Sequence, residues 1–266
     1  MGRLGPKPHL VAIGPPSVSA LAACAIMSED NHPARPASLT LMAGPIDTRI
    51  APTKVNDFAT SKPLKWFEDN LINYVPMQCK GAWRKVYPGF IQVTAFMSMN
   101  LERHVKSHKD LLEHLANGDI EKAETIKTFY DEYFAVMDLP ADFYIDTIRD
   151  VFQEHLLPQG KLMYKGRPVK PGSIKKMGLM TVEGEKDDIC SIGQTLAAQD
   201  LCTGVRAYRK LHHMPAGFGN FGVFSGKEWN NEIYRLLRVF TDRNSCRTQP
   251  DPVPTNQTAD ERNMET

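Results

Sequence analysis

Short apolar runs separated by turn residues mark the beginning of the chain. Residues 9–13 read His-Leu-Val-Ala-Ile, and a Gly-Pro-Pro break separates this run from an alanine-rich helical pattern over 17–27. A second apolar run over 38–44 leads into a polar loop. Apolar runs of this length, bounded by glycine and proline, predict buried strands. The pattern therefore predicts a strand, a sharp turn, a helix and a second strand within 1–54.

The hydrophobic pattern changes to helical spacing in the middle of the chain. Apolar residues recur at helical intervals around 63–70, 90–106, 121–137 and 142–157. Spacing of this kind is typical of amphipathic helices that bury one face. Residues 55–170 are therefore predicted to form a helical insertion, or lid.

Strand and helix patterns return after the insertion. Residues 178–184 form a third apolar run, a helical pattern begins near position 191, and an amphipathic helix ends near position 240. Strands and helices on both sides of a helical block indicate an α/β core, whose C-terminal part comprises 171–242. The polar segment 243–266 contains several prolines and no apolar periodicity, so we expect a disordered tail there.

Composition and charge narrow the functional classes. The 266 residues are 42% apolar, which is enough for a sizeable core, and 32 basic against 31 acidic residues leave a net charge of +1. Such a balance gives no field that would attract nucleic acid. Five cysteines without disulfide or metal-ligand spacing favour reduced thiols in the cytoplasm. No stretch approaches the roughly 18 apolar residues of a membrane span.

Two loops stand where an α/β-hydrolase carries catalytic residues. In open α/β sheets ligands bind where the strands end, and in hydrolases the nucleophile occupies a tight strand-to-helix turn. The acid and the histidine follow in chain order. Here Gly14 occupies the turn, and Asn220 occupies a glycine-rich loop that reads like the site of a catalytic histidine. Both positions lack a reactive side chain, and Asp187 lies between them as a candidate acid.

Three motifs carry a resemblance to one family. They are Leu-Met-Ala-Gly-Pro-Ile-Asp-Thr-Arg-Ile at 41–50, Thr-Val-Glu-Gly-Glu-Lys-Asp-Asp-Ile at 181–189 with Gly-Gln-Thr at 193–195, and Gly-Val-Phe-Ser-Gly at 222–226 with Trp229. Over roughly 9–241 the chain resembles the intracellular polyhydroxyalkanoate (polyhydroxybutyrate) depolymerases. The resemblance implies an α/β-hydrolase fold with a cysteine nucleophile, a distal aspartate and a histidine, in chains that extend well upstream of this Met1.

The resemblance carries over residue by residue. The family's Val-Cys-Gln-Pro turn corresponds to 13–16, so Gly14 takes the place of the nucleophile. Asp187 corresponds to the family's acid, which this chain therefore retains. The family's Gly-His-Tyr-Gly-Val-Phe loop corresponds to 219–224, so Asn220 replaces the histidine. We therefore expect a partial α/β-hydrolase-type sheet with an inserted helical lid, lacking the N-terminal strands, exposing an unpaired sheet edge and carrying a degenerate catalytic triad.

The family activity sets the expected function and partners. The resemblance implies hydrolysis of the ester bonds of a cytoplasmic storage polyester to hydroxyacids, without a cofactor. One hypothesis is a truncated, catalytically impaired polyhydroxybutyrate depolymerase. The other is a non-catalytic protein whose lid aromatics contact the polyester granule or a homologous chain, although aromatics of this kind more often fill a core. The aromatics concerned are Trp66, Trp83, Phe90, Phe96, Phe129, Tyr130, Tyr133 and Phe134.

Several polar residues near the expected site have two interpretations. Ser17 is either a displaced nucleophile on the same turn or the N-cap of the following helix. Asp188 is the neighbour that would take over the role of Asp187. His212 or His213 either substitutes for the missing base or lies on the surface of a flexible strand.

The remaining candidates are expected to be structural. Asp47 and Arg49 should pair or cap within their own loop. Cys24 should face the packing of its helix, where burial raises the pKa of a thiol and leaves little thiolate. No metal site is expected in the lid, because a histidine pair at i, i+4 spacing finds no convincing third ligand. The lid histidines concerned are His104, His108 and His114.

Overall fold

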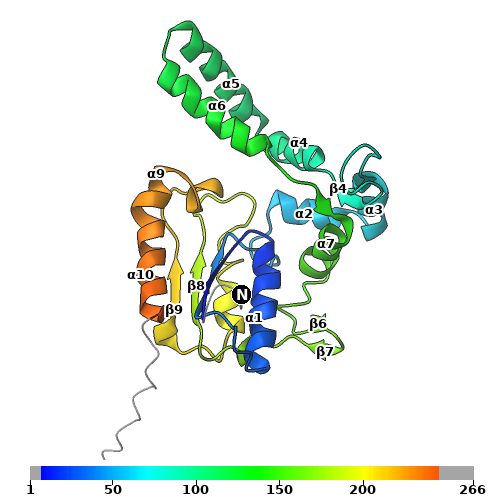
Figure 1. Ribbon diagram of the computed structural model, residues 1–266, viewed down its shortest axis with the longest axis vertical. Coiled ribbons are helices and arrows are strands. Elements are labelled where there is room, and N and C mark those ends of the chain that lie inside the picture. The colour runs from blue at the N-terminus through cyan, green and yellow to red at the C-terminus, as the bar shows by residue number, and fades with distance from the viewer. Residues whose placement is uncertain (1–6, 246–266) are drawn as a thin grey trace, which may run out of the picture.

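A parallel sheet forms the centre of the computed structural model, which describes residues 7–245 (Figure 1). Within these residues its strands are β1 (His9–Ile13), β2 (Ser38–Met42), β8 (Gly178–Val182) and β9 (Lys210–His213), in the order β1-β2-β8-β9. All neighbours pair in parallel. The central strands β2 and β8 are buried at every position, as expected for parallel strands covered on both faces. The three predicted strands are confirmed, and β9 was not predicted.

Helices cover both faces of the sheet. They are α1 (Pro16–Glu29) and α8 (Ala197–Leu201) on one face and α10 (Tyr234–Ser245) on the other. Leu21 of α1 shares an apolar cluster with Leu39 of β2, whereas Phe240 of α10 shares a second cluster with Met180 of β8. Figure 1 shows α1 and α10 on either side of the strands. The core thus consists of two apolar layers that enclose the sheet.

Helix α10 extends further than the sequence pattern indicates. It continues to Ser245, so residues 243–245 of the expected tail are helical. The rest of that expected tail, 246–266, lies outside the described residues.

The turn between β1 and α1 forms without a side-chain cap. Helix α1 begins at Pro16, whose ring fixes φ near the helical value, and Pro15 occupies the N-cap position. Ser17 therefore lies within the first turn, where it is fully buried and donates from its hydroxyl to the carbonyl of Ala12 at 3.2 Å. The N-cap interpretation of Ser17 is wrong, because the helix starts two residues earlier, with Pro15 as its N-cap.

Strand β1 lies at an edge of the sheet. In the described part of the chain it pairs with β2 alone. Val11 and Ile13 are exposed along this strand, in contrast to the fully buried residues of β2. An unpaired edge presents free backbone N–H and C=O groups that can accept a further strand.

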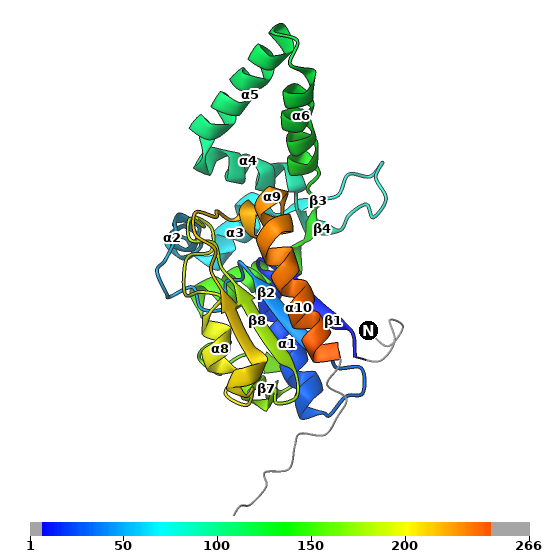
Figure 2. The same ribbon diagram turned by 90° about the vertical axis from the view of Figure 1, so that its left-hand side faces the viewer.

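The lid is the long insertion between β2 and β8. Its helices are α2 (Lys54–Ser61), α3 (Leu64–Leu71), α4 (Gly89–Met99), α5 (Leu101–Ala116), α6 (Ile120–Phe134) and α7 (Ala141–Asp146), and its short strands are β3 (Asn73–Tyr74), β4 (Lys85–Tyr87) and β5 (Leu139–Pro140). A π-helical segment, Thr147–Gln153, follows α7. Figures 1 and 2 show α5 and α6 as a helical hairpin that projects away from the sheet.

The lid aromatics divide between a small core and the surface. Phe67 is fully buried with Ile148 and Phe152, and Tyr130 is buried between α5 and α6. Trp83 and Phe90, by contrast, are exposed. The expectation that these aromatics fill a core is therefore correct for Tyr130. For the exposed ones, which are Trp83, Phe90, Phe96, Phe129 and Phe134, it is wrong.

Short elements complete the fold around the sheet. They are the hairpin β6 (Met163–Tyr164) and β7 (Arg167–Pro168), helix α9 (Gly226–Glu228), a π-helical segment (Trp229–Ile233), and 3-10 turns at Pro171–Ser173, Ala207–Arg209 and Phe221–Val223. Among the helices described, none has the length and apolar character needed to cross a lipid bilayer.

Candidate active site

The turn after β1 has the geometry of a nucleophile elbow but no side chain. Gly14 follows the last residue of β1 and adopts a φ of +67°, in the left-handed region. Its N–H donates to the carbonyl of Met42 at 2.9 Å, and its carbonyl accepts from the N–H of Ser17 at 3.0 Å. A Cβ built on Gly14 meets no atom within 4 Å. The elbow therefore has open space where an attacking side chain would stand.

The candidate acid is held in a buried loop after β8. One carboxylate oxygen of Asp187 accepts from the N–H groups of Ile189 and Cys190, each at 2.9 Å. The other oxygen accepts from the side-chain amide of Asn220, also at 2.9 Å. Burial raises the pKa of Asp187 above its usual value, and these three hydrogen bonds partly offset that shift.

The contact between Asn220 and Asp187 can be compared with the contact between histidine and acid in a catalytic triad. A triad histidine donates one ring N–H to the acid and uses its other nitrogen to take the proton of the nucleophile. The Asn220 amide makes the first of these hydrogen bonds. Its remaining oxygen has no basicity near neutral pH. The pair can hold the loop in place, but it cannot move a proton.

A second buried carboxylate, which the sequence analysis did not single out, organises the loops around the site. Glu183 follows β8 and accepts from the N–H groups of Gly193, Thr195 and Leu196 at 2.7 to 3.0 Å. The Thr195 hydroxyl in turn donates to the carbonyl and accepts from the N–H of Gly44. Such pairing is what allows a carboxylate to be buried. Its only sequence signal was its place in the motif at 181–189.

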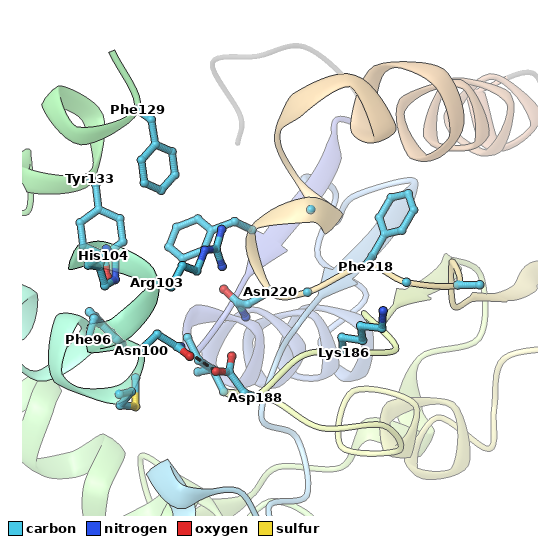
Figure 3. Close-up of a pocket in the computed structure, with 17 residues that line it drawn as sticks. Phe96, Asn100, Arg103, His104, Phe129, Tyr133, Lys186, Asp188, Phe218 and Asn220 are labelled. Carbon is cyan, nitrogen blue, oxygen red and sulfur yellow. Dashed lines mark hydrogen bonds between the residues drawn. The ribbon is translucent and has the colours of Figure 1, made fainter. Parts of the chain in front are cut away.

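A cavity of about 770 Å³ lies between the lid and the loop that holds Asn220 (Figure 3). It is lined by Phe96, Met99, Asn100, Arg103, His104, Phe129, Tyr133, Lys186, Asp188, Ile189 and residues 216–222. Asp188 accepts a hydrogen bond at 2.8 Å from the side-chain amide of Asn100, which joins the lid to the loop after β8. Asn220 lines this cavity, whereas Gly14 does not.

The alternative site residues have other contacts. The predicted pairing of Asp47 and Arg49 is confirmed by two hydrogen bonds at 2.7 and 2.8 Å, which hold the pKa of Asp47 below its usual value. His212 bonds to the Thr181 hydroxyl at 3.0 Å. His213 lies 3.0 Å from a carboxylate oxygen of Glu232. Both histidines belong to the sheet strand β9, where His212 is exposed and His213 is partly buried.

The buried thiol and the lid histidines have packing roles. Cys24 is fully buried, and its burial raises the pKa of the thiol to about 12, as the sequence analysis expected. His104 is buried and forms a 2.9 Å hydrogen bond with the hydroxyl of Tyr130. The ring of His108 packs against the same tyrosine at 4.2 Å between centroids. These contacts join α5 to α6.

A family model described as "PHB de-polymerase C-terminus" matches residues 43–245. The chain belongs to this family. The match includes Asp187, Asn220 and the whole lid. Gly14 precedes the matched segment, so its correspondence to the family nucleophile rests on the elbow geometry and on the motif resemblance. By sequence, no curated protein matches the chain.

Several solved structures share part of the fold. A monoacylglycerol lipase from Paleococcus ferrophilus is 12% identical, with 92% of this chain and 70% of that chain covered and a TM-score of 0.45. An epoxide hydrolase from Bacillus megaterium is 12% identical (89% and 69%; TM-score 0.44), and Rv0554 from Mycobacterium tuberculosis is 13% identical (88% and 65%; TM-score 0.43). The chain thus spans about two thirds of their length. Its partial α/β-hydrolase-type fold is evident in its own parallel sheet, elbow and inserted lid.

Gly14 in the elbow and Gly44 in the loop after β2 should differ in their tolerance of a side chain. Gly14→Ala adds a methyl group in open space. Its only expected cost is that of holding a residue with a Cβ at a left-handed φ, about 1–2 kcal/mol of folding stability. Gly44→Ala places a Cβ 2.4 Å from both Cβ and Oγ of the buried Ser17, so it should cost about 3 kcal/mol. Urea denaturation of both variants measures the difference. A larger loss for Gly14→Ala than for Gly44→Ala would contradict this account of the elbow.

Proposed function

We propose that this chain is a catalytically impaired member of the depolymerase family that still binds a storage polyester. The observation that carries the proposal is the hydrogen bond from the Asn220 amide to Asp187. It supports the correspondence of Asn220 to the family's histidine position, because the residue at that position must contact the acid. The proposed setting is the cytoplasm, at the surface of a polyester granule.

The chemistry of ester hydrolysis explains the impairment. In a cysteine triad the histidine deprotonates the thiol, the thiolate attacks the ester carbonyl, and water then releases the hydroxyacid. Gly14 supplies no attacking atom, and Asn220 cannot accept the proton. Loss of a triad as a unit costs about 10⁶ in turnover, and the remaining ~10³–10⁴ over water comes from binding and the oxyanion hole. A displaced nucleophile at Ser17 would first have to leave its buried hydrogen bond to Ala12.

The proposal includes a shortened sheet. Two observations support this part of it: Val11 and Ile13 of β1 are exposed, and among the described strands β1 pairs with β2 alone. In α/β-hydrolases an oxyanion-hole N–H comes from a loop that follows an earlier strand of the sheet. A sheet without that strand would lack one of the two donors that stabilise the developing oxyanion.

Hydrolysis is the first test of the proposal. The purified protein, incubated with amorphous polyhydroxybutyrate granules, should release 3-hydroxybutyrate only at the rate of a buffer control, because nucleophile and base are absent. The released acid is measured by chromatography, with an active family depolymerase as the positive control. Turnover that survives both Asp187→Ala and Ser17→Ala would show that the site is misplaced. Turnover lost only with Ser17→Ala would establish the displaced serine instead.

The surface of the lid favours the second hypothesis, a non-catalytic granule-binding protein. Along α5, Leu101, Val105, Leu112 and Leu115 are 45% to 67% exposed. At about 100° per residue these positions fall within roughly 80° of the helix circumference, so they form one apolar stripe. The stripe lies on the hairpin that projects from the molecule (Figures 1 and 2). An exposed apolar patch of this kind is typical of a surface that binds an apolar partner.

Granule sedimentation tests the role of this stripe. The double variant Leu112→Gln/Leu115→Gln removes exposed apolar surface without changing the charge, so binding should weaken at least about tenfold. The control variant Lys106→Gln/Lys109→Gln changes polar residues of the same helix and should bind like the unaltered protein. Equal binding by the leucine variant and the unaltered protein would exclude the stripe as the granule contact. Reduced self-association without a change in granule binding would assign the stripe to a homologous chain.

A further inference from the structure

The cavity carries two cationic side chains that the proposed hydrolytic chemistry does not use. Arg103 extends from α5, and Lys186 extends from the loop after β8. Figure 3 shows them on opposite sides of Asn220, Arg103 on the lid side and Lys186 on the side of the sheet loops. The lid and the core therefore each contribute one positive charge to the same cavity.

The charges that line the cavity are not balanced. Its single lining carboxylate is Asp188, which already accepts a hydrogen bond from Asn100. Among the side chains that the structure describes, neither Arg103 nor Lys186 forms an ion pair. His104 adds no charge at neutral pH, because burial lowers its pKa. The side chains that line the cavity thus carry a net positive charge, which one ligand carboxylate would balance.

Aromatic side chains from the lid and from the Asn220 loop form the main apolar part of the lining. Phe96, Phe129 and Tyr133 of the lid line it together with Phe218 and Phe221 of the loop that holds Asn220. The Phe221 ring packs against the rings of Phe129 and Tyr133, at 6.4 and 5.8 Å between centroids. Aromatic walls suit a ligand body made of methyl and methylene groups. A ligand that satisfies both the charges and the walls is therefore a short apolar chain that ends in an anion.

We propose that this cavity binds the carboxyl end of a hydroxyacid polyester or oligomer, with Arg103 and Lys186 holding the terminal carboxylate. The inference rests on the proposed polyester binding and adds the part of the polymer that is recognised. A linear polyester has neutral ester units along its length and one carboxylate at one end. The planar guanidinium of Arg103 suits bidentate contact with that carboxylate, and Lys186 supplies a second charge. An ester interior offers no anion to either side chain.

A pair of matched ligands tests this recognition. Isothermal titration of the unaltered protein with the linear tetramer of 3-hydroxybutyrate, as the free acid and as its methyl ester, compares ligands that differ at the terminal carboxylate. The acid should bind about tenfold more tightly or better. Arg103→Gln and Lys186→Gln should each reduce the difference in affinity between the free acid and the methyl ester. Raised salt should reduce the same difference. Lys109→Gln, on the same helix but outside the cavity, should leave it unchanged. All three side chains are exposed, so the fold is not at risk.

The outcomes separate this inference from the proposed function. Equal binding of acid and ester by the unaltered protein, binding of neither, or a difference that persists in both cavity variants would overturn carboxylate recognition. Granule sedimentation reports independently on polyester binding. Granule binding with equal oligomer affinities would reject the inference and retain the proposed function. Preferential binding of the free acid without granule binding would support carboxylate recognition and reject granule binding.

Discussion

The parallel pairing of β2 with β8 is the constraint on which the site depends. A parallel connection leaves one end of the sheet and must re-enter at the other end. The chain meets this requirement by building the lid beyond the carboxyl end of β2 and then returning along the sheet through residues 147–177. The loops after β1, β2, β8 and β9 consequently open at the same edge of the sheet, beneath the lid. Gly14, Asp187 and Asn220 lie in three of these loops.

Buried carboxylates hold this edge of the sheet together. Glu183 fixes the turn that begins at Gly193, and Asp187 fixes both its own loop and Asn220. Each buried charge is compensated by several N–H donors, without which burial would be costly. The Asn220 amide donates a hydrogen bond to Asp187, and its oxygen is not basic near neutral pH. The turn after β1 is likewise held by backbone hydrogen bonds, from Gly14 to Met42 and from Ser17 to Gly14, which need no side chain at Gly14.

Local pattern and motif order predicted the central strands, the elbow, the lid and the Asp47–Arg49 pair. Strand β9 escaped prediction because Lys-Leu-His-His has no apolar run and lies at an edge. One predicted helix over 90–106 is broken at Asn100, whose φ of −132° and ψ of 42° separate α4 from α5. The helix expected from 191 begins only at Ala197, because the intervening turn donates its N–H groups to Glu183. Contacts of this kind join distant segments, so no local pattern could reveal them.

The most direct measurement of the central claim is the pH dependence of thiol alkylation at the elbow. Gly14→Cys and Gly14→Cys/Asn220→His are compared by peptide-resolved mass spectrometry with iodoacetamide, and Gly14→Cys/Asn117→His serves as a control at the tip of the lid. If Gly14 and Asn220 occupy the nucleophile and histidine positions, the introduced imidazole should lower the apparent pKa of the introduced thiol by about one unit or more from ~8.5. The control should match the single variant. Identical pH profiles for all three variants would contradict the assignment of these two positions.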